Sequence, residues 1–286
     1  MFAGNEWAHN SAPFRCLDLD VVVHTSDPAL AAAVDIVFAP CASGLADQAV
    51  HYAIGFDPVR DHFVLECGGE TITTTEWACV ALDYLVWDVN RRVVEASGRQ
   101  LLLHAAAAAR DGVAVVIPAV SGGGKSTLVA ALVAAGFEYL SDEIVAIEPG
   151  SATIGGYHKA IALKEGSWPL IDAGVPSAAM APFMAMTHYV TPAMLGSTVA
   201  QHSARPGLVV IPVRDAVVEG EVEVHRAEAL TVMAEQSFNF EEFGSSRLGV
   251  LADVVRQSRC YRVATANLDD AVEAISRALT PAVGVS

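Results

Sequence analysis

A glycine-rich run near the middle of the chain has the residue types and spacing of a phosphate-binding loop. The run AVSGGGKS, residues 119–126, follows the pattern G-x-x-x-x-G-K-[ST] at every position except the first. Glycines let backbone N–H groups turn towards phosphate oxygens, and the N-terminus of the following helix adds further donors. In this pattern the lysine reaches the terminal phosphates and the hydroxyl binds Mg²⁺. The predicted binding residues are Ser121, Gly122, Gly123, Gly124, Lys125, Ser126 and Thr127.

Ala119 takes the place of the pattern's first glycine. A small residue is tolerated there if its φ is negative, whereas a positive φ would make alanine costly and weaken phosphate binding. The alternative interpretation of the run is a glycine-rich turn that only joins a strand to a helix. An apolar segment before the run and a helical segment after it favour the phosphate site.

An acidic pair, Asp142 and Glu143, follows Lys125 by 17 and 18 residues. Neighbouring residues on an extended segment point to opposite faces, so one carboxylate can face a metal and the other an incoming nucleophile. Phosphoryl transfer to a hydroxyl needs both functions. A solvated acidic turn is the alternative.

The segments around these residues predict the elements that position them. Asp111-Gly112 lies between two apolar runs and predicts a hairpin of two antiparallel strands, near 101–109 and 113–118. The phosphate-binding run follows the second strand, and an almost wholly apolar helix over 125–136 follows the run, with Gly136 at its end. Strands at 137–141 and 144–148 should flank the acidic pair.

His104 lies in the first strand of that hairpin, within an otherwise apolar run. A single histidine in such a run is commonly a core residue with its hydrogen bonds satisfied, and the pattern alone leaves that alternative open.

For the rest of the chain, the pattern predicts a mixed α/β lobe before the hairpin and further helices and strands after it. We expect a strand over 14–25, a helix over 27–38 and strands at 51–56 and 62–67. Thr73 and Glu76 have capping-box spacing for a helix ending at Gly98. Trp77, Val80, Ala81 and Tyr84 fall on one face of that helix, which we interpret as core packing. A strand at 207–213 and helices at 246–257 and 268–279 complete the prediction.

Composition excludes several classes of protein. The 286 residues are 53% hydrophobic and 17% charged, which is typical of a folded domain. The formal net charge of −16 argues against nucleic acid as the main partner, and the apolar runs are too short to span a membrane. No secretory signal is visible, and the five scattered cysteines suit reduced, buried thiols in a cytoplasmic protein.

Residues 102–149 resemble the catalytic core of HPr kinase/phosphorylase, which combines a histidine-bearing strand, a P-loop and an acidic pair. The closer similarity is to HPr-kinase-related kinase A proteins, which are related to the kinases of lasso-peptide precursors and share elements such as LHAA, SGGGKSTL and LSDE. The stretches AIALKEGSWPLI, GSTVAQHSARPG and QSFNFEEFG, at 160–171, 196–207 and 236–244, also look like this group.

The resemblance implies a P-loop domain of the HPr kinase/phosphoenolpyruvate-carboxykinase-like type over 99–286, after a smaller α/β lobe over 1–98. It implies ATP and Mg²⁺ as cofactors and a Ser/Thr hydroxyl of a peptide or small protein as acceptor. By position, Lys125 and Ser126 take the nucleotide and metal roles, Asp142 the general base and Glu143 a metal role. His104 matches the family's active-site histidine.

Two departures limit what the resemblance implies. Glu143 stands where HPr kinase itself has Asp, and the glutamate motif behind its phosphorylase activity has only Glu165 as a loose counterpart. We therefore do not expect HPr as the substrate. Lys164, His202 and Arg205 lie in family-like stretches and are candidates for phosphate or substrate contacts, with surface polar residues as the alternative.

Together these observations predict a cytoplasmic kinase of a peptide or small protein, with a homo-oligomer as a possible assembly. The alternatives are a non-catalytic nucleotide-binding module that acts as a sensor or scaffold, a plain ATPase and a small-molecule kinase.

Overall fold

The computed structural model describes residues 8–43, 48–214, 220–239 and 246–279. Its contacts divide the chain into two compact units. The first comprises Met1–Ser97 and His158–Met194, and the second comprises Gly98–Tyr157 and Leu195–Ser286. Both contain helices and sheets, so the mixed α/β class expected from the sequence is confirmed.

A six-stranded sheet forms the centre of the first unit, in the order β1-β3-β4-β5-β6 with β2 added on β3. The strands are β1 (His9–Asn10), β2 (Phe14–Cys16), β3 (Leu19–Thr25), β4 (Val50–Asp57), β5 (His62–Cys67) and β6 (Glu70–Thr75). Strands β3 and β4 are parallel, and the other pairs are antiparallel. The single strand predicted over 14–25 is therefore a tight hairpin, turned at Leu17 with a φ of 53°.

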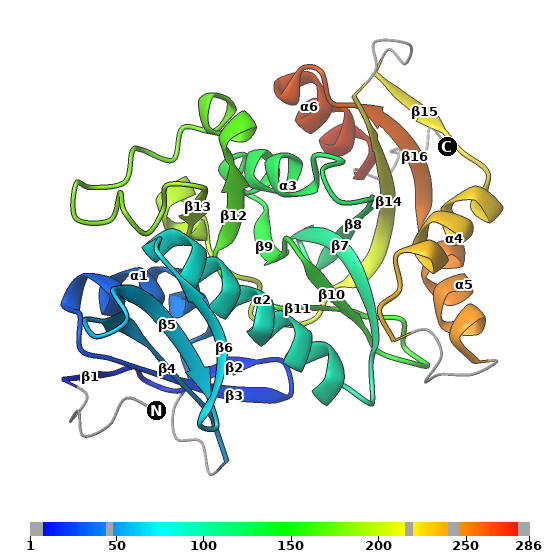
Figure 1. Cartoon of the computed structure of the whole chain (residues 1–286). Helices are drawn as coiled ribbons and strands as arrows, with labels where there is room; N and C mark the ends of the chain where they lie inside the picture. The colour runs from blue at the N-terminus through cyan, green and yellow to red at the C-terminus, as the bar shows by residue number, and fades with distance from the viewer. Residues whose placement is uncertain (1–7, 44–47, 215–219, 240–245, 280–286) are drawn as a thin grey trace, which may run out of the picture. The chain divides into compact units, whose positions relative to one another are not determined.

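Two helices, α1 (Pro28–Phe38) and α2 (Ala78–Ala96), pack against this sheet (Figure 1). Asp27, where the predicted helix begins, caps α1, since its carboxylate accepts hydrogen bonds from the N–H groups of Ala29 and Leu30; such a cap contributes about 1 kcal/mol. Residues 158–194 add the two-stranded sheet of β12 (Ile161–Lys164) and β13 (Thr187–Val190), joined to α1 by a hydrogen bond from Ala160 N–H to the Val37 carbonyl. Short 3₁₀ helices lie at Ala39–Cys41, Glu165–Leu170 and Pro192–Leu195.

The helix predicted over 73–98 is wrong at its start and in its buried face. The threonine-rich segment before it pairs with β5 as strand β6, so no capping box forms at Thr73. The helix ends at Ala96, before Gly98. Its buried side carries Leu82, Leu85, Val89 and Val93, while Trp77 and Tyr84 are 65% and 43% exposed. The compact aliphatic side chains meet the sheet, and the large rings face outward.

An eight-stranded sheet forms the second unit, in the order β11-β10-β7-β8-β14-β16-β15 with β9 also paired to β7. The strands are β7 (Leu101–Arg110), β8 (Val113–Pro118), β9 (Glu138–Ser141), β10 (Ile144–Ile147), β11 (Ile154–Gly156), β14 (Arg205–Val213), β15 (Glu221–Glu223) and β16 (Arg259–Ala264). The predicted hairpin of β7 and β8 is confirmed, and both residues of its turn, Asp111 and Gly112, have positive φ. Strands β8, β14 and β16 run parallel.

Helices cover both faces of this sheet (Figure 1). They are α3 (Lys125–Ala134), α4 (Arg226–Glu235), α5 (Arg247–Gln257) and α6 (Leu268–Leu279). Odd-numbered residues of β7, from Leu101 to Ala109, share a core with α4 and α5. Since side chains alternate along a strand, the even-numbered residues, including His104, face the other side, where α3 packs on β7 and α6 packs on α3. The predicted helices near 125, 246 and 268 are confirmed, whereas α4 and β16 were not predicted.

All five cysteines are buried free thiols, as predicted from their spacing. In the described part of the chain, no helix combines the length and the apolar character that crossing a bilayer requires.

Candidate phosphate-binding site

The glycine-rich run lies between β8 and α3, and two kinds of constraint act on its three glycines. Gly122 and Gly124 have φ values of +79° and +88°, which residues with a side chain rarely adopt. A Cβ atom on Gly123 would lie 3.0 Å from the Cβ atom of Ala119 and 3.0 Å from the carbonyl oxygen of Val120. The loop therefore excludes side chains at three successive positions, which leaves its backbone open to a close ligand.

Ala119 is not among the residues with positive φ. The condition under which alanine is tolerated at the first position of the pattern is thus met. Its methyl group instead occupies the space beside Gly123, so the two small residues depend on each other.

Lys125 is the first residue of α3, and its side chain is folded back along the loop. The residue is only 6% exposed, and its ammonium group donates hydrogen bonds to the carbonyl oxygens of Ala119 and Val120, at 2.8 Å and 3.2 Å. Gly124 starts the helix without a side-chain cap. The first N–H groups of an α-helix have no acceptor within the helix, so this end favours an anion.

Asp142 lies beside the hydroxyl of Ser126. The Asp142 carboxylate is fully buried and accepts hydrogen bonds from Ser126 Oγ at 3.3 Å and from Tyr139 Oη at 3.0 Å. Carboxylate and hydroxyl oxygens are ligands that Mg²⁺ prefers. The neighbouring Thr127 is 7% exposed.

Glu143 lies beside His104, with 3.4 Å between Glu143 Oε1 and His104 Nε2. The carboxylate side chain is 35% exposed and the imidazole 21%. The Phe238 ring lies near the imidazole, with its centroid 5.6 Å from that of His104. The two acids therefore have separate partners, one on the loop side and one on the histidine side.

The register of the sheet explains this arrangement. Strand β7 pairs with β9 along Ala107–Ala109 and with β10 along Leu101–His104. The two acids form the bend between β9 and β10, opposite the middle of β7, where Ala105 N–H donates to the Glu143 carbonyl. His104 pairs directly with Ile144, so it stands next to Glu143 across the strands.

Arg214 is a site residue that the sequence analysis missed. A Cβ atom on Gly124 would lie 3.5 Å from Arg214 Nε, so the guanidinium group is close to the loop. Arg214 directly follows β14, which is parallel to β8, and the carboxyl ends of parallel strands meet at one edge of a sheet. Its position directly after an apolar strand could have indicated Arg214 as a site residue from the sequence.

Two of the remaining candidates, Arg205 and His202, belong to the second unit. Arg205 pairs with Val113 at the start of β8, whereas the loop follows the end of that strand, about 17 Å further along at 3.3 Å per residue. His202 is exposed, and Lys164 and Glu165 belong to the first unit. Residues 240–244 of the stretch QSFNFEEFG fall outside the described residues.

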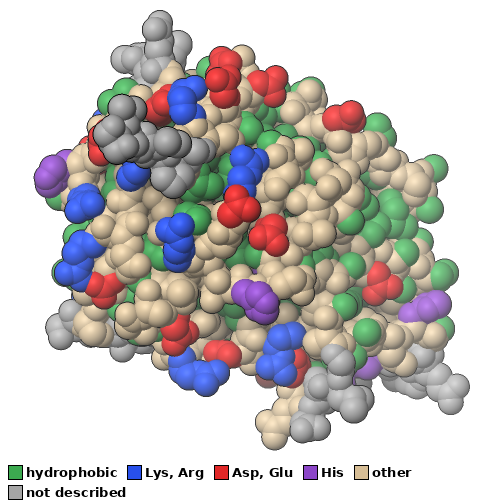
Figure 2. Space-filling view, turned by 180° about the vertical axis from the view of Figure 1, so that it is seen from behind, with side chains coloured by type: hydrophobic (Ala, Val, Ile, Leu, Met, Phe, Trp, Pro, Cys, Tyr) green, Lys and Arg blue, Asp and Glu red, His purple; other side chains and the backbone are tan. Residues whose placement is uncertain are grey.

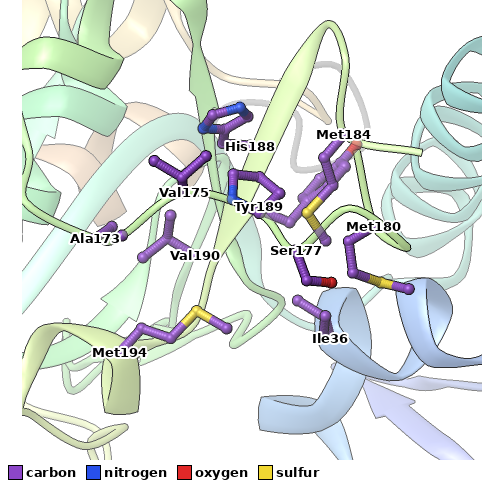
Figure 3. Close-up of a pocket in the computed structure, with 12 residues that line it drawn as sticks. Ile36, Ala173, Val175, Ser177, Met180, Met184, His188, Tyr189, Val190 and Met194 are labelled. Atoms are coloured by element: carbon purple, nitrogen blue, oxygen red, sulfur yellow. The ribbon is translucent and has the colours of Figure 1, made fainter. Parts of the chain in front are cut away.

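A separate apolar cavity of about 240 Å³ lies in the first unit (Figure 3). Met180, Met184 and Ile36 lie on one part of its wall, and His188 on another. The Trp168 ring stacks on His188 with 3.7 Å between centroids, and burial lowers the pKa of His188. The cavity thus offers apolar surface and a neutral imidazole at pH 7.

Acidic and basic side chains intermingle on the face of the molecule shown in Figure 2. Several arginines are paired, among them Arg277 with Glu221 and Glu273, and Arg262 with Glu228. Exposed pairs of this kind contribute little to stability. The absence of a nucleic-acid partner stays a prediction.

No protein-family model matches this sequence, and a search of curated proteins finds no match. Solved structures that match include the HPr(Ser) kinase/phosphatase from Coxiella burnetii, at 12% sequence identity and a TM-score of 0.29. The match covers 62% of this chain and 90% of that one. A likeness this weak does not decide the fold family or the activity of this chain.

Proposed function

We propose that the protein is a kinase that transfers the terminal phosphoryl group of ATP to a hydroxyl group of a peptide or small protein, with Mg²⁺ as cofactor. The observation that carries the proposal is the hydrogen bond between Ser126, on the phosphate-binding loop, and Asp142, in the acidic pair. This hydrogen bond brings together the phosphate-binding loop and the acidic pair, which are separate in the sequence. Plain phosphate binding would not require a second acid beside a histidine.

The residues at the loop fit a nucleotide and its metal. The bare backbone at Gly122–Gly124 suits phosphate oxygens, and Lys125 and Arg214 bring two positive charges to the same place. Among the described residues, no group of three or more His, Cys, Asp or Glu side chains is arranged to hold a metal. Mg²⁺ in nucleotide sites needs only one or two protein ligands beside the phosphates, and Ser126 and Asp142 would supply them.

ATP supplies the phosphoryl group, and Mg²⁺ offsets the negative charge of its oxygens. We expect Lys125 to leave the carbonyls of Ala119 and Val120 and bind phosphate in their place. The N-terminus of α3 and Arg214 would stabilise charge that develops in the transition state.

The acidic pair can divide its work in two ways. The sequence analysis expected Asp142 as the general base and Glu143 at the metal. The buried position of Asp142 against Ser126 supports the reverse division, because hydroxyl and carboxylate ligands of Mg²⁺ lie together in P-loop proteins. Glu143, more exposed and beside His104, would then accept the proton of the acceptor hydroxyl, with His104 orienting the carboxylate.

Calorimetry with the Mg²⁺ complex of a non-hydrolysable ATP analogue tests the first part of the proposal. We expect binding by the intact protein and binding about 10- to 100-fold weaker by Lys125→Ala. Incubation with γ-labelled ATP and candidate peptides tests the second part. A sensor would bind the analogue and label nothing, and an ATPase would release phosphate at full rate without peptide.

A further inference from the structure

Helix α2 carries an exposed aromatic surface that the proposed chemistry does not use. Tyr84 and Trp87 are 43% and 56% exposed, and Met186, which precedes β13, is 57% exposed. Large apolar side chains gathered at one exposed place indicate a binding surface. These residues belong to the first unit.

The rings of Tyr84 and Trp87 stand at a steep angle to each other, with centroids 6.2 Å apart and planes at 70°. Together with Val80, Asp83 and Met186 they line a recess of about 490 Å³. We call this set of five residues the α2 recess. Rings arranged in this way present π faces that attract a cation.

Asp83 adds a carboxylate to the apolar wall of the recess. It accepts hydrogen bonds from Tyr189 Oη at 2.7 Å and from Thr187 Oγ1 at 3.2 Å. Burial raises the pKa of Asp83 above its usual value, and these two hydroxyl groups and the charge of Lys164 offset only part of this rise. A carboxylate offers about four lone-pair positions, and the two hydroxyl groups occupy two of them. The carboxylate therefore keeps capacity for a further donor.

The charge and the rings together favour a guanidinium group over an apolar ligand. A guanidinium is planar, stacks on aromatic rings and binds carboxylates with two N–H groups. Trp87 already has one such neighbour, since Arg91 Cζ lies 6.0 Å from the ring centroid. Asp88 and Glu95 both pair with Arg91, which compensates its charge. The net charge of −16 adds attraction for a basic ligand at long range.

We propose that the α2 recess binds an arginine side chain of a basic peptide, with Asp83 as the counter-ion and Tyr84 and Trp87 as the aromatic walls. That this peptide is also the phosphate acceptor rests on the proposed function. The recess itself requires only the first unit.

The test uses a short glycine–serine peptide with one arginine, compared with the same peptide carrying neutral citrulline. Binding to the full-length chain is followed by the indole N–H signals of its tryptophans in proton–nitrogen correlation NMR. We expect the Trp87 signal to shift, and the Kd to be about tenfold higher for the citrulline peptide. Equal affinities for the two peptides would overturn the inference.

Variants locate the binding. Trp87→Ala and Asp83→Asn should each weaken binding of the arginine peptide about tenfold. Trp77→Ala removes an exposed tryptophan outside the recess and should leave the Kd unchanged. Because Asp83→Asn disturbs two hydrogen bonds, circular dichroism checks its fold, and the exposed Trp87 carries the test if that variant unfolds. Unchanged binding in Trp87→Ala would overturn the inference.

Two further measurements separate this inference from other outcomes. Lys125→Ala should weaken nucleotide binding and keep peptide binding. Peptide binding that persists when no phosphoryl transfer is found would therefore support this inference even if the kinase proposal fails. Sedimentation velocity of the intact chain and of Trp87→Ala tests self-association. If the intact chain is a dimer and the variant a monomer, the recess is an interface between copies, and the inference is wrong.

Discussion

The hydroxyl of Ser126 donates a hydrogen bond to the carboxylate of Asp142 across 3.3 Å, although 16 residues separate them in the chain. Between them lie the rest of α3, which contains Ser126, and strand β9. The contact forms because the helix returns the chain to β7, next to the strand that leads into the loop. Most of the expected behaviour of the site follows from this relationship.

The division of labour between the two acids can be tested by neutral, isosteric substitutions. We expect Glu143→Gln to retain Mg²⁺-dependent binding of the ATP analogue and to lower phosphoryl transfer by about 10²- to 10⁴-fold, as loss of a general base does. We expect Asp142→Asn to weaken the Mg²⁺-dependent part of binding. Calorimetry with and without Mg²⁺ and initial rates of labelling measure the two effects. If Asp142→Asn bound normally and only transfer failed, the assignment made from the sequence would hold instead.

Lys125→Ala should lower affinity for the nucleotide by about 10- to 100-fold, because a charge-assisted hydrogen bond contributes about 1.5–3 kcal/mol. Calorimetry with the magnesium-loaded analogue measures it. The substitution also removes the hydrogen bonds to the carbonyls of Ala119 and Val120, so the melting temperature is recorded as well. Val120→Ala, at an exposed position of the same loop, is the matched control. An affinity equal to that of the unaltered protein would contradict the proposed role.

Gly123→Ala should destabilise the second unit by about 1–3 kcal/mol, since the new methyl group meets the Ala119 methyl and the Val120 carbonyl at 3.0 Å. Adding Ala119→Gly removes one of the two clashes, so the double variant should recover part of the loss. Urea denaturation of the single and double variants measures both. No recovery in the double variant would show that the clash with Val120 alone decides the cost.

In the first unit, the buried carboxylate of Asp88 accepts hydrogen bonds from Tyr52, Arg91 and Arg92. Burial raises the pKa of Asp88, but hydrogen bonds from Arg92, Tyr52 and Arg91 outweigh it, so the pKa lies below its usual value. The stabilisation is therefore complete above about pH 4 and is lost as the pH falls further.

Asp88→Asn should accordingly cost about 2 kcal/mol at pH 7, because it weakens the charge-assisted hydrogen bonds from Tyr52 and from the partly exposed Arg91 and Arg92. The difference in free energy of unfolding between the two proteins should shrink towards pH 3. Urea denaturation at both pH values measures it. A difference that does not depend on pH would mean that packing, and not charge, accounts for the effect.

The sequence alone predicted the elements whose causes are local. The turn at Asp111-Gly112 identified the hairpin of β7 and β8, and Asp27 identified the start of α1. The glycines before Lys125 identified a loop in which two positions have positive φ and a third has no room for a side chain. Backbone conformation and capping depend on neighbours within a few residues, so the sequence carries them directly.

The buried face of helix α2 was predicted wrongly because the helix has two apolar faces. Trp77 and Tyr84 form one and Leu82 and Leu85 another, and periodicity cannot tell which of them meets the sheet. Threonines before a helix are compatible with either an N-cap or a strand. Here they form a strand, because the segment pairs with β5.

What the sequence determined by itself is the inventory of the site: a loop without side chains, a lysine, a hydroxyl, two acids and a histidine in the order of the chain. Only the tertiary structure decided which of them meet. It paired Asp142 with Ser126 and Glu143 with His104, placed Arg214 against Gly124 and grouped residues 158–194 with the first unit. Such contacts depend on the register and order of strands that are far apart in sequence. The local conformational preferences of the residues do not determine either.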